Sequence, residues 1–514
     1  MPGKLLVCSR FANKKIEAHA GLGLRLLRAR ETIKTDKLCK YSLRTPLRLH
    51  HLCHSETVKI IAQLDYQAVL ANQARPIHFA LQLQVPAMVN PRPKPAAFAI
   101  VLDHSGSMKG PPLQHAKDAT KLAIRNLRKE DSFALAIFET SAQVIIPMQS
   151  AANKAAFLPL VDKIMDAGST NLTGGWMLGR DELAKSPPEA SRRLLLLSDG
   201  LLNMGIVEPP QVRQIVATGL EHSGIRTSCL GFGPNYNEDL MAELARATGG
   251  QFYAADSPEK LPAIFAAELE GLQKLVSQNV RVRIKRLDFC ESYLALGNYP
   301  AVTLPDGRVE FAVGDLVSEE ERILCFVLEV LPLPCVQGAP VASLEGEQLL
   351  EVEVAYDEIG ESEIASHLFK QIIRVQATQN PAEVKLNGQV VSWVAMQRVG
   401  KVLDEVTARM DTGRFDEAIQ ALTRALEALK AYGPAEQVGP AMLQLQALLE
   451  KIQGGEWNLS ERKSSRYRSS SYAKMSSHEL WTLKQPAPEF KKKTLPPEPP
   501  LTPPTPPQPP SDQP

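Results

Sequence analysis

The stretch Phe98-Ala-Ile-Val-Leu-Asp-His-Ser-Gly-Ser-Met108 decides the fold of this chain. It begins as a short apolar run, of the length of a buried strand. It then turns polar at Asp103, Ser105 and Ser107, and Pro112 suits the first turn of a following helix. A strand, a tight polar turn and a helix place ligand-binding groups at the carboxyl edge of an open α/β sheet. One carboxylate and two hydroxyls at that edge suit a hard divalent cation.

Two further segments can bring oxygen ligands to the same edge. Gly168-Ser-Thr-Asn-Leu172 is a small polar loop that can project Thr170. Leu194-Leu-Leu-Leu-Ser-Asp-Gly200 is a second apolar strand, and it ends in Asp199. Taken alone, Asp103 is explained as a strand-end turn residue, and Asp199 as part of an Asp-Gly turn. Neither explanation accounts for the whole set.

The order Asp103-x-Ser105-x-Ser107, then Thr170, then Asp199 resembles the metal-ion-dependent adhesion site of von Willebrand factor A domains. In that family the hydroxyls bind the ion, and the aspartates bind it directly or through water. The resemblance implies a site for Mg²⁺, or for Mn²⁺ or Ca²⁺, formed by all five residues. Its open position would accept an Asp or Glu of a partner protein, so it would make a cation-bridged contact and would not be catalytic.

Three more segments are similar to the bacterial branch of this family. They are Ser198-Asp-Gly-Leu-Leu-Asn-Met-Gly-Ile206, Leu230-Gly-Phe-Gly-Pro-Asn-Tyr-Asn237 and Gly249-Gly-Gln-Phe-Tyr253. Some members of the branch carry a calcium-activated chloride channel label, and we do not extend channel activity to this chain. We interpret Asn235, Asn237 and Asp239 as turn and helix-cap residues, with a second metal site as the weaker alternative.

Composition describes an ordinary globular protein of more than one domain. The chain has 514 residues, 44% hydrophobic residues and a formal net charge of +1, so its bulk charge indicates neither nucleic acid nor membrane binding. No apolar run approaches the roughly 20 residues of a membrane span. The seven cysteines show no tight pairing pattern, so we expect reduced, mostly buried thiols and a cytoplasmic location.

The chain begins with a basic segment and then changes to β-strand patterns. Residues 1–57 hold 12 Lys and Arg against four Asp and Glu, and we expect a disordered leader there. A transit peptide is one alternative. Another is a zinc cluster, although its spacing matches no common pattern; its ligands would be Cys39, His50, His51, Cys53 and His54. Residues 58–95 contain strands that have no sheet of their own.

Residues 96–275 alternate strand and helix, which predicts a mostly parallel sheet covered on both faces. Residues 276–380 show the alternation of a β-sandwich. The simplest arrangement has the strands of 58–95 completing this sandwich, with the α/β domain inserted between them. Residues 385–455 have helical spacing and predict a small bundle of about three helices. Residues 456–514 are Ser/Arg-rich and then Pro-rich, with 13 Pro in the last 29, and predict a disordered tail.

The first functional hypothesis is a non-enzymatic, metal-dependent protein-binding scaffold. The alternative is an accessory subunit of an ATPase-driven assembly or metal-insertion complex. The ATPase would then be another chain, because no Gly-x-x-x-x-Gly-Lys-Ser/Thr loop occurs here. A metal-dependent hydrolase is the third hypothesis, and it would need a base beside the ion. His104 is expected to be a surface or supporting residue, and Ser105 and Ser107 lack the G-x-S-x-G elbow of a nucleophile.

Overall fold

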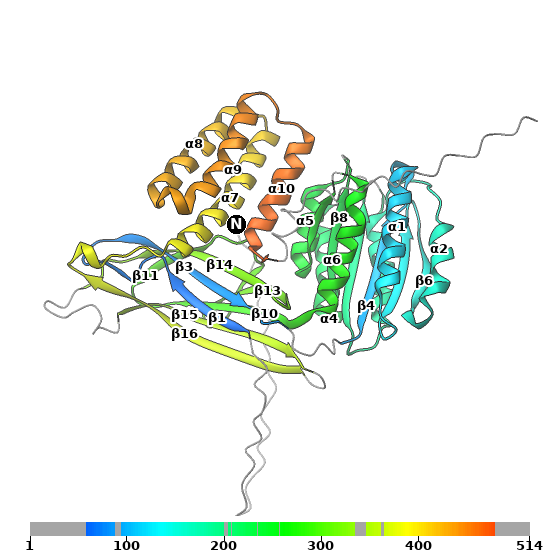
Figure 1. The fold of residues 1–514 in the computed structure, drawn as a ribbon, viewed down its shortest axis with the longest axis horizontal. Helices are drawn as coiled ribbons and strands as arrows, with labels where there is room; N and C mark the ends of the chain where they lie inside the picture. Colours follow the sequence, from blue (N-terminus) through cyan, green and yellow to red (C-terminus); the bar gives the residue numbers. More distant parts are fainter. Residues whose placement is uncertain are drawn as a thin grey trace, which may run out of the picture. The chain divides into compact units, whose positions relative to one another are not determined.

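The computed structural model describes residues 58–87, 94–199, 204–206, 208–233, 235–255, 257–334, 346–360 and 364–477 (Figure 1). The predicted leader, its transit-peptide and zinc alternatives, and the Pro-rich part of the tail lie outside these residues. Within the described chain, one six-stranded sheet belongs to the inserted domain, and a four-stranded and a six-stranded sheet form the sandwich. No helix of the described residues is long and apolar enough to cross a bilayer.

The inserted domain is built on a sheet with the strand order β6-β5-β4-β7-β8-β9. The neighbours from β5 to β9 pair in parallel, and β6 pairs antiparallel with β5 at one edge. The predicted mostly parallel sheet is therefore confirmed. The strands are β4 (Ala96–Asp103), β5 (Ser132–Phe138), β6 (Ala142–Ser150), β7 (Ser191–Ser198), β8 (Arg226–Phe232) and β9 (Phe252–Ala255).

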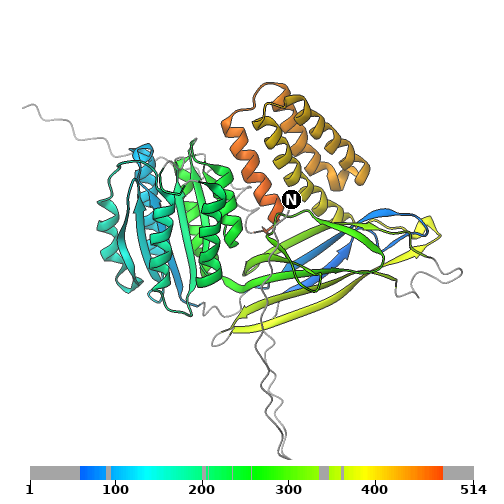
Figure 2. The ribbon, with the colours of Figure 1, turned by 180° about the vertical axis from the view of Figure 1, so that it is seen from behind.

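Helices cover both faces of this sheet because its central strands are apolar on both sides (Figures 1 and 2). In β4, Phe98 and Ile100 point into one core, and Ala99 and Val101 point into the other. The first core lies under α1 (Pro111–Asn126), α2 (Leu158–Asp162) and α6 (Leu261–Gln273). The second lies under α3 (Leu172–Ala184), α4 (Pro209–Ser223) and α5 (Glu238–Thr248).

Two sheets form the sandwich, antiparallel except for the parallel pair β16–β2, and strands from both sides of the inserted domain contribute to it. The four-stranded sheet has the order β1-β3-β14-β11, so β3 pairs directly with β14 although the whole inserted domain separates them. The predicted insertion is confirmed by this pairing. The four-stranded sheet contains β1 (Lys59–Leu64), β3 (Arg75–Gln84), β11 (Cys290–Ala295) and β14 (Glu321–Val330). The other contains β2 (Ala68–Leu70), β10 (Leu275–Arg286), β12 (Ala301–Thr303), β13 (Val309–Val317), β15 (Glu347–Ile359) and β16 (Ile364–Thr378).

The two ends of the inserted domain meet at one turn of the sandwich. The carbonyl of Pro86, before the domain, accepts the N–H of Glu319 at 3.4 Å. The carbonyl of Lys274, after the domain, accepts the N–H of Ser318 at 2.8 Å. Entry and exit therefore lie next to each other, as an inserted domain requires. The described cysteines Cys229, Cys290 and Cys325 are free and buried, as predicted.

The C-terminal region contains four helices, and three of them lie within residues 385–455, as predicted. They are α7 (Gly388–Asp411), α8 (Phe415–Tyr432), α9 (Ala435–Gln453) and α10 (Leu459–Lys474). The expectation that the tail is disordered from residue 456 onward is wrong for α10. This helix packs along α7 and contacts α5 and β9 of the inserted domain.

Helix α10 is ordered by buried polar contacts whose partners lie outside its own sequence. Lys463 Nζ lies 2.7 Å from Glu238 Oε2 and 2.6 Å from the carbonyl of Tyr236, and both charged side chains are buried. Arg462 lies 2.7 Å from both Asp239 and Asp411, so it joins the inserted domain to α7. Most helices are held on their domain by an apolar stripe, whereas α10 is held largely by charge-assisted hydrogen bonds.

Candidate metal centre

Two central parallel strands bring the predicted ligands to one edge of the sheet. β4 and β7 are neighbours, with Leu102 opposite Leu197. Both strands therefore end at the same level, β4 at Asp103 and β7 just before Asp199. After β4 the chain turns through the short 3₁₀ helix Gly106–Met108, and α1 follows. This is the strand-turn-helix geometry that the sequence predicted for the site.

Hydrogen bonds connect four of the five predicted ligands. The Asp103 carboxylate accepts the N–H of Ser105 at 2.9 Å and the hydroxyl of Ser198 at 2.6 Å. The Ser107 hydroxyl donates to Asp199 at 2.7 Å, and the oxygens of Ser105 and Ser107 lie 3.1 Å apart. The side chains of Ser105, Ser107 and Asp199 therefore converge, and Asp103, the last residue of β4, is bonded to the backbone of Ser105.

Thr170 lies in the neighbouring loop, which is tied to the first by backbone contacts. The carbonyl of Gly168 accepts the N–H of Gly106 at 3.2 Å, and Thr170 itself is buried. Gly168 has φ +61°, and a Cβ there would lie 1.8 Å from the Glu139 carboxylate. Only glycine fits this position, because the loop both turns left-handed and passes against Glu139. The loop thus holds Thr170 beside the strand ends.

The electrostatics of the two carboxylates favour a positive ion. Burial raises the pKa of Asp103, and hydrogen bonds from Ser198 and Ser105 only partly oppose this. Burial also raises the pKa of Asp199 to about 6; the Ser107 hydroxyl opposes the rise and the Asp103 charge adds to it. No Lys or Arg of the described residues forms an ion pair with either carboxylate. Two buried, unpaired carboxylates at one point need a cation to be stable as anions.

The donor set fits a hard divalent cation. Two carboxylates and three hydroxyls provide oxygen atoms only, which is the chemistry that Mg²⁺, Mn²⁺ and Ca²⁺ prefer. Within the residues that the structure describes, no group of three or more His, Cys, Asp or Glu side chains is arranged to hold a metal. A cation at this edge would thus depend on Ser105, Ser107 and Thr170 as well as on the aspartates.

Comparisons with known proteins agree with this geometry. The von Willebrand factor type A domain family matches residues 98–267. This chain contains a von Willebrand factor A domain. The solved structure of a von Willebrand factor type A protein from Catenulispora acidiphila superposes on 81% of the chain and on 96% of its own length, with a TM-score of 0.62 and 17% identity. That likeness concerns the fold, and it extends beyond the A domain.

Curated relatives share the sequence over shorter regions. The uncharacterized protein sll0103 of Synechocystis sp. is 25% identical over 301 residues, which are 56% of this chain and 68% of that protein. The uncharacterized protein YfbK of Escherichia coli is 28% identical over 37% of this chain and 33% of its own. An inter-alpha-trypsin inhibitor heavy chain H1 of Sus scrofa is 32% identical over 29% of this chain, and the match spans only 18% of that protein.

Sequence reasoning missed several residues that support or surround the site. Ser198 holds Asp103, and its only signal was its place directly before Asp199. His104 is buried, and its Nδ1 lies 2.8 Å from the carbonyl oxygen of Met165, so it fixes the neighbouring loop. The sequence predicted a surface or supporting role for His104, and the structure shows the supporting one.

Two methionines form an apolar rim beside the metal centre. Within the described part of the A domain, Met165 and Met204 are the large apolar side chains left exposed, at 72% and 39%. Met165 is the residue whose carbonyl His104 contacts, and the N–H of Met204 donates to the carbonyl of Thr170 at 3.3 Å. Flexible, polarizable methionines adapt to varied apolar partners. We call Met165 and Met204 the methionine rim.

Asn237 and Asp239, which the alternative of a second metal site would use, have other roles. The Asn237 side chain accepts the N–H of Leu240 at 3.1 Å and caps the start of α5, which confirms its interpretation as a cap residue. Asp239, in the first turn of α5, is not a cap: it pairs with Arg462 and Arg466 of α10. Asn235 takes part in neither set of contacts.

Proposed function

We propose that this protein is a non-enzymatic, cation-dependent protein-binding scaffold. The cation would be Mg²⁺ or a similar divalent ion held by Asp103, Ser105, Ser107, Thr170 and Asp199. Its open coordination position would accept an Asp or Glu side chain of a partner protein. The observation that supports this most directly is the cluster of oxygen atoms around Ser107 and Asp199, 2.7 Å apart, where no Lys or Arg of the described chain pairs with the carboxylates.

The charge balance explains why the contact would depend on the ion. Without a cation, Asp103 and Asp199 would face an incoming carboxylate, and like charges in a partly buried site repel. With a cation whose ligands include three neutral hydroxyls, the site keeps net attraction for one more carboxylate. The ion therefore converts a repulsive surface into an attractive one, and chelation is expected to abolish binding.

The methionine rim narrows the kind of partner that would fit. An acidic residue on the ion would lie close to Met165 and Met204, which offer apolar contact area. We therefore expect the partner's Asp or Glu to be flanked by apolar side chains. Methionine and aromatic side chains are enriched in protein interfaces relative to the rest of the surface, which agrees with an apolar contact at the methionine rim.

Metal binding is the first test, because it needs no partner. Calorimetric titration of the full chain with Mn²⁺ should give one site, and Asp103→Asn should lower its affinity by about a hundredfold. Asp181→Asn is the matched control, since Asp181 is an exposed aspartate of the same domain, on α3. Equal affinities in wild type and Asp103→Asn would contradict the proposed metal site.

Partner binding is the second test. Proteins captured on the immobilised chain in Mg²⁺ and in EDTA should be identified by mass spectrometry, and the captured partner should then be titrated. Asp199→Ala and Thr170→Ala should both weaken its binding in Mg²⁺, while the melting temperature stays near that of wild type because both residues lie at strand ends and loops. Undiminished binding in EDTA would show that the partner uses another surface.

A further inference from the structure

Strand β16 leaves most of one edge open. It pairs with β15 from Ile364 to Val375 along one side. On its other side it pairs with β2 only at Gln376–Thr378. Residues 364–375 thus have no strand on that side among the described residues. An unpaired edge of this length is a template for another strand, and proteins usually block such edges with charges, proline or a covering element.

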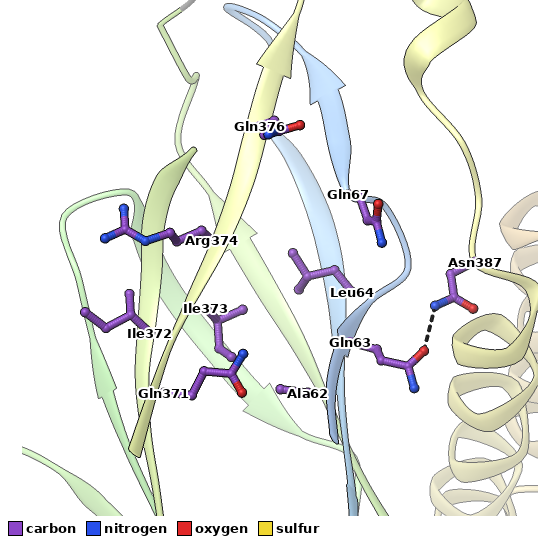
Figure 3. Close-up of a pocket in the computed structure, with 10 residues that line it drawn as sticks. All are labelled: Ala62, Gln63, Leu64, Gln67, Gln371, Ile372, Ile373, Arg374, Gln376 and Asn387. Atoms are coloured by element: carbon purple, nitrogen blue, oxygen red, sulfur yellow. Dashed lines mark hydrogen bonds between the residues drawn. The ribbon is translucent and has the colours of Figure 1, made fainter. Parts of the chain in front are cut away.

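The same segment exposes an apolar stripe. Ile364, Leu368 and Ile372 are 48%, 55% and 40% exposed. They share one face of the strand because they are separated by even numbers of residues. Their odd-numbered neighbours Phe369 and Ile373 pack toward the core of the sandwich. The opposite directions of Ile372 and Ile373 are visible in Figure 3. Exposed apolar side chains next to an open strand edge indicate a surface that another chain covers.

The order of side chains in β16 is nearly symmetric about Leu368. In an antiparallel pair of two identical strands centred there, Leu368 lies opposite itself and Ile364 lies opposite Ile372. Lys370 then faces Ser366, so the pairing sets no like charges against each other. Centring on Phe369 would instead place Ile364 opposite Arg374 and break the stripe. We propose that β16 pairs with β16 of a second copy of this chain, centred on Leu368, to form a twofold dimer.

A groove leaves room for the end of the partner strand. It lies between β1 and β16, has a volume of about 370 Å³, and is lined from one side by Ala62 and Gln63 and from the other by Gln371 and Ile373 (Figure 3). In the register centred on Leu368, the Ile364 end of the partner's β16 would enter beside Ile372. The groove thus prevents a clash between that end and β1, and a twofold contact repeats the same fit on both sides.

Cysteine cross-linking tests the register directly. Residues directly opposite in an antiparallel pair have Cα atoms about 4.5–5.5 Å apart, within the range of a disulfide. Leu368→Cys should therefore form a covalent dimer under mild oxidation. Ile364→Cys alone should not, because its own copy would lie about 27 Å away, eight residues along the strand. A mixture of Ile364→Cys and Ile372→Cys chains should cross-link. Wild type, oxidised in parallel, gives the background of the native cysteines.

The oligomeric state tests the surface itself. Sedimentation of the full wild-type chain over about 1–100 µM should show a concentration-dependent dimer. Leu368→Asp places two negative charges opposite each other and should raise the dissociation constant at least about fivefold. Val302→Asp is the matched control: Val302 is 64% exposed on β12, at the other end of the same sheet. Equal melting temperatures show that both variants fold.

The outcomes separate the proposal from other occupants of the edge. A dimer that weakens in Leu368→Asp but not in Val302→Asp, together with the expected cross-links, supports it. A wild-type chain that stays monomeric overturns it and leaves the edge for a strand of another protein. A dimer that persists in Leu368→Asp also overturns it, because the two copies then associate elsewhere.

Discussion

The metal centre and helix α10 are both built from polar side chains, and they are assembled over very different distances along the chain. At the metal centre, Asp103 accepts the N–H of Ser105 two residues away, and the longest side-chain contact, from Ser198 to Asp103, spans 95 residues of one domain. At α10, Lys463 reaches Glu238 across 225 residues. The metal centre is therefore assembled inside the A domain, whereas the contact of α10 forms only after the A domain and the C-terminal helices have met. A site built inside one domain should tolerate single changes, and the contact between regions should depend strongly on both partners.

The largest effect is expected from breaking the long-range pair. Lys463→Ala should destabilise the protein by about 3 kcal/mol in denaturant unfolding, because it leaves the buried Glu238 carboxylate with one cation fewer. The double variant Glu238→Met with Lys463→Met should recover most of this loss. Arg180→Ala, which removes an exposed ion pair with Asp181, should cost at most about 0.5 kcal/mol. Equal effects of Lys463→Ala and Arg180→Ala would show that the buried pair stabilises the protein no more than an exposed one.

A buried carboxylate whose partners all lie in or beside the A domain sharpens the comparison. Asp131 accepts the N–H groups of Arg128 and Ala96 at 2.8 and 2.9 Å, and also Gln273 Nε2 at 3.1 Å. It thus ties the first strand of the A domain to its last helix. Asp131→Asn should destabilise the A domain by about 2 kcal/mol at neutral pH, since charge-assisted hydrogen bonds are lost in a buried site.

The pH dependence of that variant follows from the pKa of Asp131. Burial alone would raise this pKa, but hydrogen bonds from Arg128 and Ala96 outweigh burial and hold it below 3.8. A lowered folded-state pKa stabilises the protein above the unfolded-state value, and this stability is lost as pH falls through the folded-state value. The difference between wild type and Asp131→Asn should be constant above about pH 5 and shrink below pH 3.8. A constant difference down to pH 2.5 would contradict this.

Close packing of α10 on α7 gives a smaller expected effect. Ser469 is buried, and its hydroxyl has no hydrogen-bond partner among the described residues. A Cβ on Gly400 of α7 would lie 3.2 Å from the Ser469 carbonyl oxygen, so the two helices touch by backbone. Ser469→Leu should cost about 1.5 kcal/mol through overpacking. Ser469→Ala should be neutral or slightly stabilising, and unfolding curves of the two variants distinguish volume from polarity.

The smallest effect is expected at the metal centre. Ser107→Ala removes one neutral ligand and should weaken Mn²⁺ binding about tenfold, equivalent to 1.4 kcal/mol. The melting temperature in EDTA should not change, because Ser107 lies on the short 3₁₀ helix and, within the described chain, its hydroxyl bonds to Ser105 and Asp199 alone. A large loss of stability in EDTA would show that the hydroxyl network is structural.

The distances along the chain also decide what could be predicted. The ligands of the metal centre follow directly after apolar strands, so strand pattern and parallel order were enough to place Asp103 and Asp199 at one edge. The domain insertion was also predictable, because the first strands had no sheet of their own. Ser198 could not be distinguished from a residue that ends a strand. Its role depends on the Asp103 carboxylate, 95 residues away.

Helix α10 could not be predicted, for a physical reason. Its buried face includes Ser465, Ser469 and Tyr472 in place of a continuous apolar stripe. Its charges read as those of a disordered segment because their partners Glu238 and Asp239 lie in another domain. Disorder is predicted from the low hydrophobicity and high charge of a segment itself. That prediction is wrong for a basic helix that is ordered by acidic residues of another domain.

The insertion of the A domain also delays the pairing of two sandwich strands while the chain is being synthesised. Strand β3 is made early, and its partner β14 follows about 240 residues later; Gln82 and Glu321, which form a hydrogen bond between them, are 239 residues apart. At roughly 5–20 residues per second, β3 waits on the order of 10–50 s for β14. During that time its apolar face is unprotected. Folding of the A domain in the interval shortens the search, because it delivers the chain after Lys274 next to Pro86, where β14 is needed.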